Sequence, residues 1–206
     1  MKELYHDLIT KKSFEILKEF KKKFNFILIG GWAVYFYVKT LKSKDIDIIV
    51  DYNVLGKIKK EYEVFKNQRL KKYEIKIEGV DIDIYLPFFS KLSFPVEEIK
   101  NYTHFIEGFE IPFPEVLLIL KIKPCVERIG SLKGRKDLLD IFSLLSKEII
   151  DWNLYKKFIK RYSLQNLNEE FKKIIISVKS LPELRLSCHF ISKLKKSVLN
   201  EIEKIH

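Results

Sequence analysis

The sequence predicts an α/β (α+β) fold, with a mixed N-terminal part followed by a helical C-terminal part. Short apolar runs alternate with amphipathic helical windows up to residue 112. Beyond Pro124 the strand patterns stop and the remaining segments favour helix. The 206 residues are enough for a core that needs no disulfide or metal. We expect two domains, residues 1–123 and residues 124–206, joined near residues 123–133.

The N-terminal part begins with alternating helices and strands. Glu3–Lys23 carries apolar residues at helical spacing among lysines and acids, which predicts an amphipathic helix. Phe26–Ile29 is a short apolar run before Gly30-Gly31 and predicts a buried strand that ends in a tight turn. Trp32–Leu41 then predicts a buried helix, and Asp45–Val50 predicts a second strand.

The segment up to residue 112 predicts one more helix and further strands. Val54–Leu70 is rich in lysine and favours helix. Tyr73–Glu78 and Val80–Leu86 alternate around Gly79, which predicts a hairpin or a strand with a tight bend. His104–Pro112 predicts another strand.

The C-terminal part predicts helices throughout. Pro114 suits the first turn of a helix, and Glu115–Ile122 continues it. Four later segments also favour helix: Arg135–Ser146, Trp152–Arg161, Leu167–Val178 and Ser187–Lys204.

The charge and cysteine content restrict the class of protein. Lys and Arg number 39 against 28 Asp and Glu, a net charge of +11 that favours a polyanionic partner such as nucleic acid. Genome composition or thermophily also produces such a surplus. Two cysteines without CxxC spacing exclude a disulfide scaffold and a cysteine zinc site. The longest uncharged stretch, residues 24–38, is too short to span a membrane, so we expect a soluble cytoplasmic protein without membrane contact.

Two predicted strands carry paired aspartates. Asp-Ile-Asp-Ile occurs at residues 45–48 and again at residues 81–84. Because side chains alternate along a strand, both carboxylates of a pair lie on one face, where they repel each other. Hard oxygen ligands without His or Cys select Mg²⁺ or Mn²⁺, which would remove the repulsion. The alternative is two half-exposed strands whose solvated faces carry aspartate.

The diglycine Gly30-Gly31 lies between a predicted strand and a predicted helix. Backbone N–H groups at such a turn can bind an anion, although many Gly-Gly turns serve geometry alone. The chain has neither GxxxxGK[ST] nor GxGxxG, which excludes a P-loop protein and leaves no dinucleotide-binding fingerprint.

Together these residues resemble the DNA polymerase β-like nucleotidyltransferase superfamily. Its pattern is an apolar residue with Gly-Gly or Gly-Ser, a helix-sized gap, Asp-apolar-Asp-apolar, and a later acid between apolar residues. Here that is Ile29-Gly30-Gly31, the gap 32–44, Asp45-Ile46-Asp47-Ile48, and Asp81 or Asp83. The resemblance implies a nucleotidyltransferase fold, a mixed sheet flanked by helices.

A second resemblance points to abortive-infection-type (AbiEii-like) nucleotidyltransferase toxins and related uncharacterised prokaryotic proteins. It rests on residues 115–121, an apolar helix that ends in Lys121, and on residues 135–141, Arg-Lys-Asp-Leu-Leu-Asp-Ile. The resemblance covers about residues 26–145. The resemblance implies that an antitoxin is one of the expected partner proteins.

The chemistry that the resemblance implies is transfer of a nucleoside monophosphate from an NTP such as ATP to an acceptor hydroxyl. Two Mg²⁺ ions, or Mn²⁺, would be held by Asp45, Asp47 and a third acid. We favour Asp83 for that acid because it lies deeper in its strand, with Asp81 as the alternative. Residues expected to bind the nucleotide are Gly30, Gly31, Ser43, Lys44, Lys121, Lys136 and Asp137.

Some of these residues also have structural explanations. Lys121 suits a helix end, where its stem packs and its charge favours the macrodipole. Asp137 would stabilise the first turn of a helix, and Arg135 or Lys136 would pair with Asp140. Either way, we expect this helix to pack beside the nucleotide site.

Several functions remain open from the sequence. The acceptor could be RNA, tRNA-like RNA included, a protein side chain, or a small molecule such as an antibiotic; the lysines of residues 57–76 and the basic C-terminal helices favour RNA. The alternative outside enzymes is a non-catalytic nucleotide- or RNA-binding module on the same fold. A two-metal nuclease is a third reading, which the Gly-Gly turn disfavours.

Overall fold

The fold is given by a computed structural model that describes residues 2–204, with side chains from residue 7 onward. Contacts divide the chain into two compact units, residues 1–113 and residues 114–206. The division expected after residue 123 falls instead inside α5 (Pro114–Glu127), all of which belongs to the second unit. The expected linker at residues 123–133 is also mostly helical, because α6 already begins at Leu132.

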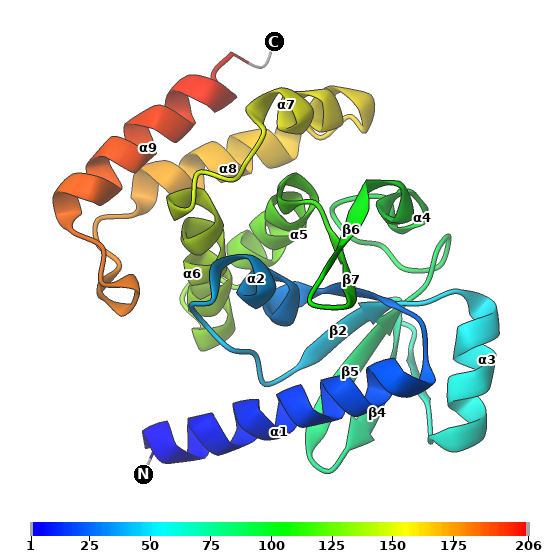
Figure 1. The fold of residues 1–206 in the computed structure, drawn as a ribbon. Coiled ribbons are helices and arrows are strands. Elements are labelled where there is room, and N and C mark those ends of the chain that lie inside the picture. The colour runs from blue at the N-terminus through cyan, green and yellow to red at the C-terminus, as the bar shows by residue number, and fades with distance from the viewer. Residues whose placement is uncertain (1, 205–206) are drawn as a thin grey trace. The chain divides into compact units, whose positions relative to one another are not determined.

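A seven-stranded mixed sheet forms the first unit (Figure 1). The strand order is β3-β4-β5-β2-β1-β7-β6, with β2 parallel to β5 and β1 parallel to β7, and the other neighbours antiparallel. This confirms the α/β class with a mixed sheet. The strands are β1 Ile27–Ile29, β2 Ile46–Ile49, β3 Phe65–Asn67, β4 Lys72–Ile77, β5 Val80–Tyr85, β6 Thr103–Ile106 and β7 Phe109–Pro112.

Helices of the first unit pack on this sheet. Contacts join α1 to β5 and α2 to β1 and β2. The indole Nε1 of Trp32 donates a hydrogen bond of 2.9 Å to the buried hydroxyl of Ser13, and the rings of Phe14 and Trp32 lie 5.1 Å apart. These contacts fix α2 against α1. The elements are α1 Lys2–Lys23, α2 Gly30–Val38, α3 Tyr52–Glu61, α4 Val96–Ile99 and the 3₁₀ helix η1 Lys100–Tyr102.

Side-chain alternation separates an apolar face of the sheet from an acidic one. Ile46 and Ile48 of β2 and Ile82 and Ile84 of β5 are fully buried. The aspartates between them point to the opposite face. Burial of the isoleucines therefore fixes the face on which the carboxylates must lie.

Two hairpins turn through a Glu-Gly dipeptide. Glu78 and Gly79 have φ of 49° and 87°, and Glu107 and Gly108 have φ of 50° and 81°. Positive φ at both central residues is the mark of a type I′ turn, which matches the twist of the paired strands. The first hairpin, β4–β5, confirms the sequence prediction. The single strand predicted at residues 104–112 is wrong, because the second Glu-Gly turn divides it into β6 and β7.

The helix predicted over residues 54–70 is too long. The helix α3 ends at Glu61, and residues 65–67 form β3, which pairs with β4 at the edge of the sheet. Lysines are common on exposed helices and on edge strands, so composition alone does not separate the two.

The second unit is helical, as expected. Its central helix is α5, whose Val116, Leu118 and Ile119 are fully buried and which contacts α6, α7 and α8. Among residues 2–204, no helix combines the length and the hydropathy that a membrane span requires. The remaining elements are α6 Leu132–Ser146, α7 Trp152–Arg161, α8 Gln165–Ser177, η2 Pro182–Leu184 and α9 Cys188–Ile202.

Candidate functional site

The start of α2 lies directly against one of the predicted aspartates. Ile29 of β1 pairs with Asp47 of β2, and Gly30 follows with a φ of +70°. A Cβ atom built on Gly30 would overlap the Asp47 carboxylate. Glycine is therefore needed at position 30 both for its backbone conformation and to leave room for that side chain. Ile29 precedes α2 without a side-chain cap for its first N–H groups.

The predicted acids meet on neighbouring strands. Asp47 and Asp83 are register partners in the parallel pair β2–β5, so their side chains lie on the same face. Asp45 comes just before β2, shares that face with Asp47, and is half-buried like it. Burial raises the pKa of the Asp83 carboxyl, and the charges of Glu74 and Asp45 raise it further. The structure thus brings the three predicted acids onto one partly buried face.

A lysine that the sequence analysis missed also belongs to this face. The Lys72 ammonium lies 2.6 Å from Oδ2 of Asp83 and 2.9 Å from Oε1 of Glu74. Burial disfavours its charge, but the hydrogen bonds to both carboxylates outweigh this and raise the Lys72 pKa. Conversely, Lys72 lowers the pKa of Asp83 against the effect of burial. Lys72 therefore supplies the countercharge for Asp83.

The second acid of β5 has different surroundings. Asp81 is exposed and lies 3.4 Å from the Lys76 ammonium, also on the protein surface. Asp83 is the register partner of Asp47, whereas Asp81 is placed two residues earlier in the strand. The choice of Asp83 as the third acid stays a prediction.

The other expected nucleotide-binding residues of the first unit lie in α2 and in the connection between α2 and β2. Gly31 is buried in the first turn of α2. Ser43 is buried in the connection between α2 and β2, and Lys44 next to it is exposed. Their contact with phosphate also stays a prediction.

The residues fit a divalent cation only in part. Asp45 and Asp47 offer hard oxygen ligands on one face, as Mg²⁺ requires. Asp83 instead directs one oxygen to Lys72. Within the described part of the chain, no three His, Cys, Asp or Glu side chains are grouped to hold a metal ion.

In the second unit, Lys121 forms a buried ion-pair cluster with two aspartates. Its ammonium lies 3.1 Å from Oδ1 of Asp137 and 2.7 Å from Oδ2 of Asp140. Asp140 thus pairs with Lys121, and Arg135 pairs with Glu183 rather than with Asp140; the alternative pair of Lys136 with Asp140 stays a prediction. Asp137 is in the second turn of α6 rather than the first, because the helix begins at Leu132. The nucleotide roles of Lys121, Lys136 and Asp137 stay predictions.

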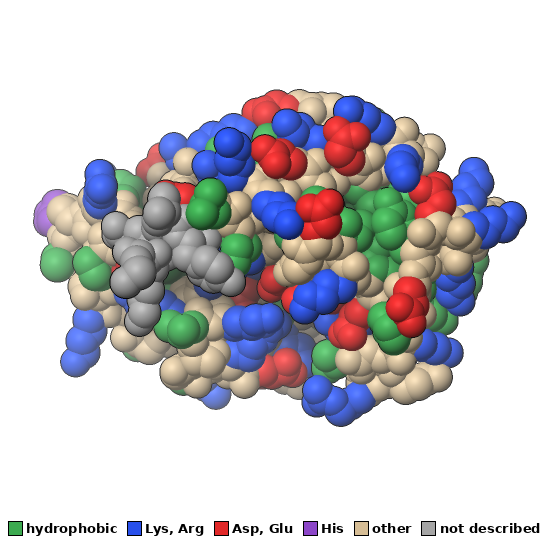
Figure 2. Space-filling model, turned by 90° about the horizontal axis from the view of Figure 1, so that it is seen from below, with side chains coloured by type: hydrophobic (Ala, Val, Ile, Leu, Met, Phe, Trp, Pro, Cys, Tyr) green, Lys and Arg blue, Asp and Glu red, His purple; other side chains and the backbone are tan. Residues whose placement is uncertain are grey.

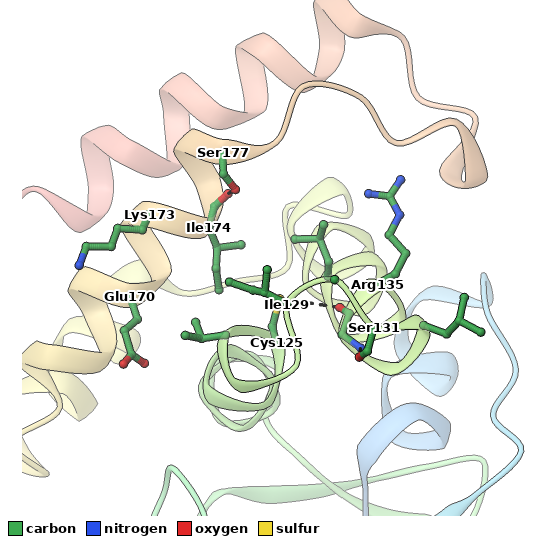
Figure 3. Close-up of a pocket in the computed structure, with 13 residues that line it drawn as sticks. Cys125, Ile129, Ser131, Arg135, Glu170, Lys173, Ile174 and Ser177 are labelled. Atoms are coloured by element: carbon green, nitrogen blue, oxygen red, sulfur yellow. Dashed lines mark hydrogen bonds between the residues drawn. The ribbon is translucent and has the colours of Figure 1, made fainter.

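A pocket of about 730 Å³ lies within the second unit (Figure 3). It opens between the end of α5, the start of α6 and α8, and Ile129 and Ile174 point toward each other across it. Lys173 and Glu170 of α8 point away from its centre (Figure 3). Burial raises the pKa of the Cys125 thiol in its wall to about 11, so this thiol is not an activated nucleophile.

Comparison with known proteins identifies the fold. No protein-family model and no curated protein matches the sequence. Among solved structures, JHP933 from Helicobacter pylori superposes with a TM-score of 0.51 at 16% identity, over 100% of this chain and 94% of that protein. A candidate nucleotidyltransferase from H. pylori gives a TM-score of 0.51 at 16% identity, over 98% and 97% of the two chains. The chain has a nucleotidyltransferase fold. At this identity the likeness concerns the fold alone, and the closeness to abortive-infection-type proteins stays a prediction.

We predict that Gly30→Ala destabilises the protein by about 2 kcal/mol or more, because a Cβ atom both strains a positive φ and displaces Asp47. Gly56→Ala is the matched control. Gly56 lies inside α3, and no neighbouring atom is close to the place that a methyl group would take, so alanine there should stabilise by about 0.5–1 kcal/mol. Urea unfolding of both variants measures the difference; equal effects would contradict the Gly30–Asp47 contact.

We also predict that Lys72→Met lowers the free energy of unfolding by about 1–3 kcal/mol, more at pH 7 than at pH 4. The folded-state pKa of Asp83 is raised, so stability falls as the pH rises and this carboxyl ionises. Lys72 offsets that cost only while Asp83 and Glu74 are charged. Unfolding curves at the two pH values provide the measurement, and a pH-independent loss would show that Lys72 acts through packing alone.

Proposed function

We propose that this protein is a metal-dependent nucleotidyltransferase that moves a nucleoside monophosphate from an NTP to an acceptor hydroxyl and releases pyrophosphate. The observation that carries the proposal is the packing of the Asp47 carboxylate on Gly30 at the start of α2, beside Asp45 and next to Asp83. An anion-binding helix start and a cation-binding acid pair at one place suit a metal–triphosphate ligand. The nucleotidyltransferase fold supports the same reading.

Each group has a distinct task in this proposal. Asp45 and Asp47 would hold Mg²⁺, which when bound neutralises the charge that develops on the triphosphate during displacement. The N–H groups of the first turn of α2 would donate to phosphate oxygens, helped by the positive end of the helix dipole. Asp83, held by the Lys72 ammonium through one oxygen, would orient the acceptor hydroxyl by accepting its hydrogen bond.

We propose RNA as the acceptor on the strength of a basic and aromatic patch. The ammonium groups of Lys59 and Lys66 lie 5.0 and 5.8 Å from the Tyr73 ring, and Lys66 and Lys71 lie 5.0 and 5.6 Å from another ring, that of Phe89. Phe88 next to it is 85% exposed at a φ of 62°. Stacking surfaces beside cations are typical of single-strand binding.

Acidic side chains compensate part of the charge surplus. On the face shown in Figure 2, lysine and arginine side chains are interspersed with acidic ones. Pairs such as Lys23–Glu61, at 2.7 Å, and Lys12–Glu78, at 3.0 Å, neutralise part of the surplus. A small-molecule or protein acceptor, an antitoxin partner and a non-catalytic binding module remain the alternatives. Incubation with labelled NTPs and either total RNA or a metabolite panel separates them by where the label goes.

We expect Asp45→Asn and Asp47→Asn each to abolish label transfer while the fold is kept or slightly stabilised, since one of two repelling carboxylates is removed. Asp51→Asn is the control, because Asp51 caps α3 and asparagine caps equally well. Transfer assays and thermal unfolding should be run together. Unfolded variants with unchanged activity per folded molecule would make these residues structural.

A second expectation concerns ligand binding without turnover. Mg²⁺ with a non-hydrolysable NTP should raise the melting temperature of the wild-type protein, and Mg²⁺ alone should raise it less. Asp47→Asn should abolish the shift. No shift at millimolar ligand in the wild type would contradict nucleotide binding altogether.

A further inference from the structure

The ammonium of Lys72 is fixed on the acidic face by two carboxylates. The Lys72 side chain is 13% exposed, and its ammonium lies within 3 Å of carboxylate oxygens of Asp83 and Glu74. Glu74 is held in turn by the side-chain amide of Asn67, at 3.1 Å. Lys72 and Glu74 come from β4 and Asp83 from β5, and Glu74 is the register partner of Asp83. The ammonium is thus held between two strands of a rigid sheet.

The position of the Lys72 ammonium affects which carboxylates a divalent cation can bind. Asp47 and Asp83 are register partners, so a metal bridging them would approach the carboxylate that Lys72 already contacts. A divalent ion and an ammonium on one carboxylate repel each other at short range. Either Lys72 leaves or the metal stays with Asp45 and Asp47.

The position of Lys72 between two strands favours the case in which Lys72 stays and the metal binds Asp45 and Asp47. Lys72 is mostly buried and has two carboxylate partners, so its departure would remove the countercharge of Glu74 even where a metal ion replaced it at Asp83. Lys76 offers a contrast on the same strand and the same face. It is 65% exposed and lies 3.4 Å from Asp81, which is 58% exposed, so it can move aside freely.

We propose that Lys72 is a positioning residue that holds Asp83 in place of a second metal ion, so that a single divalent cation binds here, through Asp45 and Asp47. The inference rests on the proposed function, because the cation is the one that accompanies the NTP. It differs from the two-ion arrangement that the family resemblance implies.

The test counts metal ions directly. Metal-free protein is dialysed to equilibrium against Mn²⁺ and a non-hydrolysable NTP, and bound Mn²⁺ and bound nucleotide are measured per chain. The wild type and Asp83→Asn should each bind one Mn²⁺ per bound nucleotide. Lys72→Met should bind two, or bind Mn²⁺ at least ten times more tightly. The matched control Lys76→Met should behave as the wild type.

Other counts of bound metal or nucleotide would contradict either this inference or the proposed function. Two Mn²⁺ ions in the wild type and one in Asp83→Asn would overturn the inference and leave the proposed function intact. One ion in Lys72→Met, with unchanged affinity, would show that Lys72 does not decide the number. No bound nucleotide in the wild type would overturn the proposed function itself. If Lys72→Met does not fold, the wild type and Asp83→Asn alone still separate one ion from two.

Discussion

The candidate site depends on the contact between the Asp47 carboxylate and the backbone of Gly30. This contact joins the end of β1, the beginning of α2 and the middle of β2 at one point. It exists because position 30 has no side chain and a positive φ, which together turn the chain from strand directly into helix. The acid and the helix start are then held at one place before any ligand arrives.

The carboxylates of Asp45, Asp47 and Asp83 repel one another on this face of the sheet, and the fold keeps them there in two ways. Fully buried isoleucines on the other face of β2 and β5 prevent a register shift that would move the acids away from one another. Lys72 then balances Asp83 and Glu74 on the neighbouring strands, while Asp47 lies against Gly30 at the helix start. In the proposed function, the fixed ammonium of Lys72 beside Asp83 would decide where on this sheet face a cation binds.

Much of this was predictable from the sequence, for physical reasons. The repeated Asp-Ile-Asp-Ile predicts acids on one strand face and isoleucines on the other because side-chain alternation in a strand is strict. The diglycine predicts a turn with a positive φ, because few residues other than glycine adopt that backbone conformation. The role of Lys72 was harder to foresee, because it depends on pairing between strands. The Glu78-Gly79 turn contained the signal: a two-residue loop sets Glu74 opposite Asp83, with Lys72 on the same face.

Other features could not be read from the sequence. The same Glu-Gly dipeptide at residues 107–108 divides the segment predicted as one strand into a hairpin, and a lysine-rich composition fits α3 and the edge strand β3 alike. The partner of Asp140 is Lys121, which is 19 residues away in the chain and comes from another helix. The pocket beside Cys125 arises from the packing of three helices, which no local pattern encodes.

The most direct measurement is a crystal structure with Mn²⁺ and a non-hydrolysable NTP, in which anomalous scattering locates the metal. The account predicts the triphosphate at the first turn of α2 and a Mn²⁺ peak at the carboxylates of Asp45 and Asp47. A nucleotide bound elsewhere, for example in the pocket beside Cys125, with no metal at these aspartates, would contradict it.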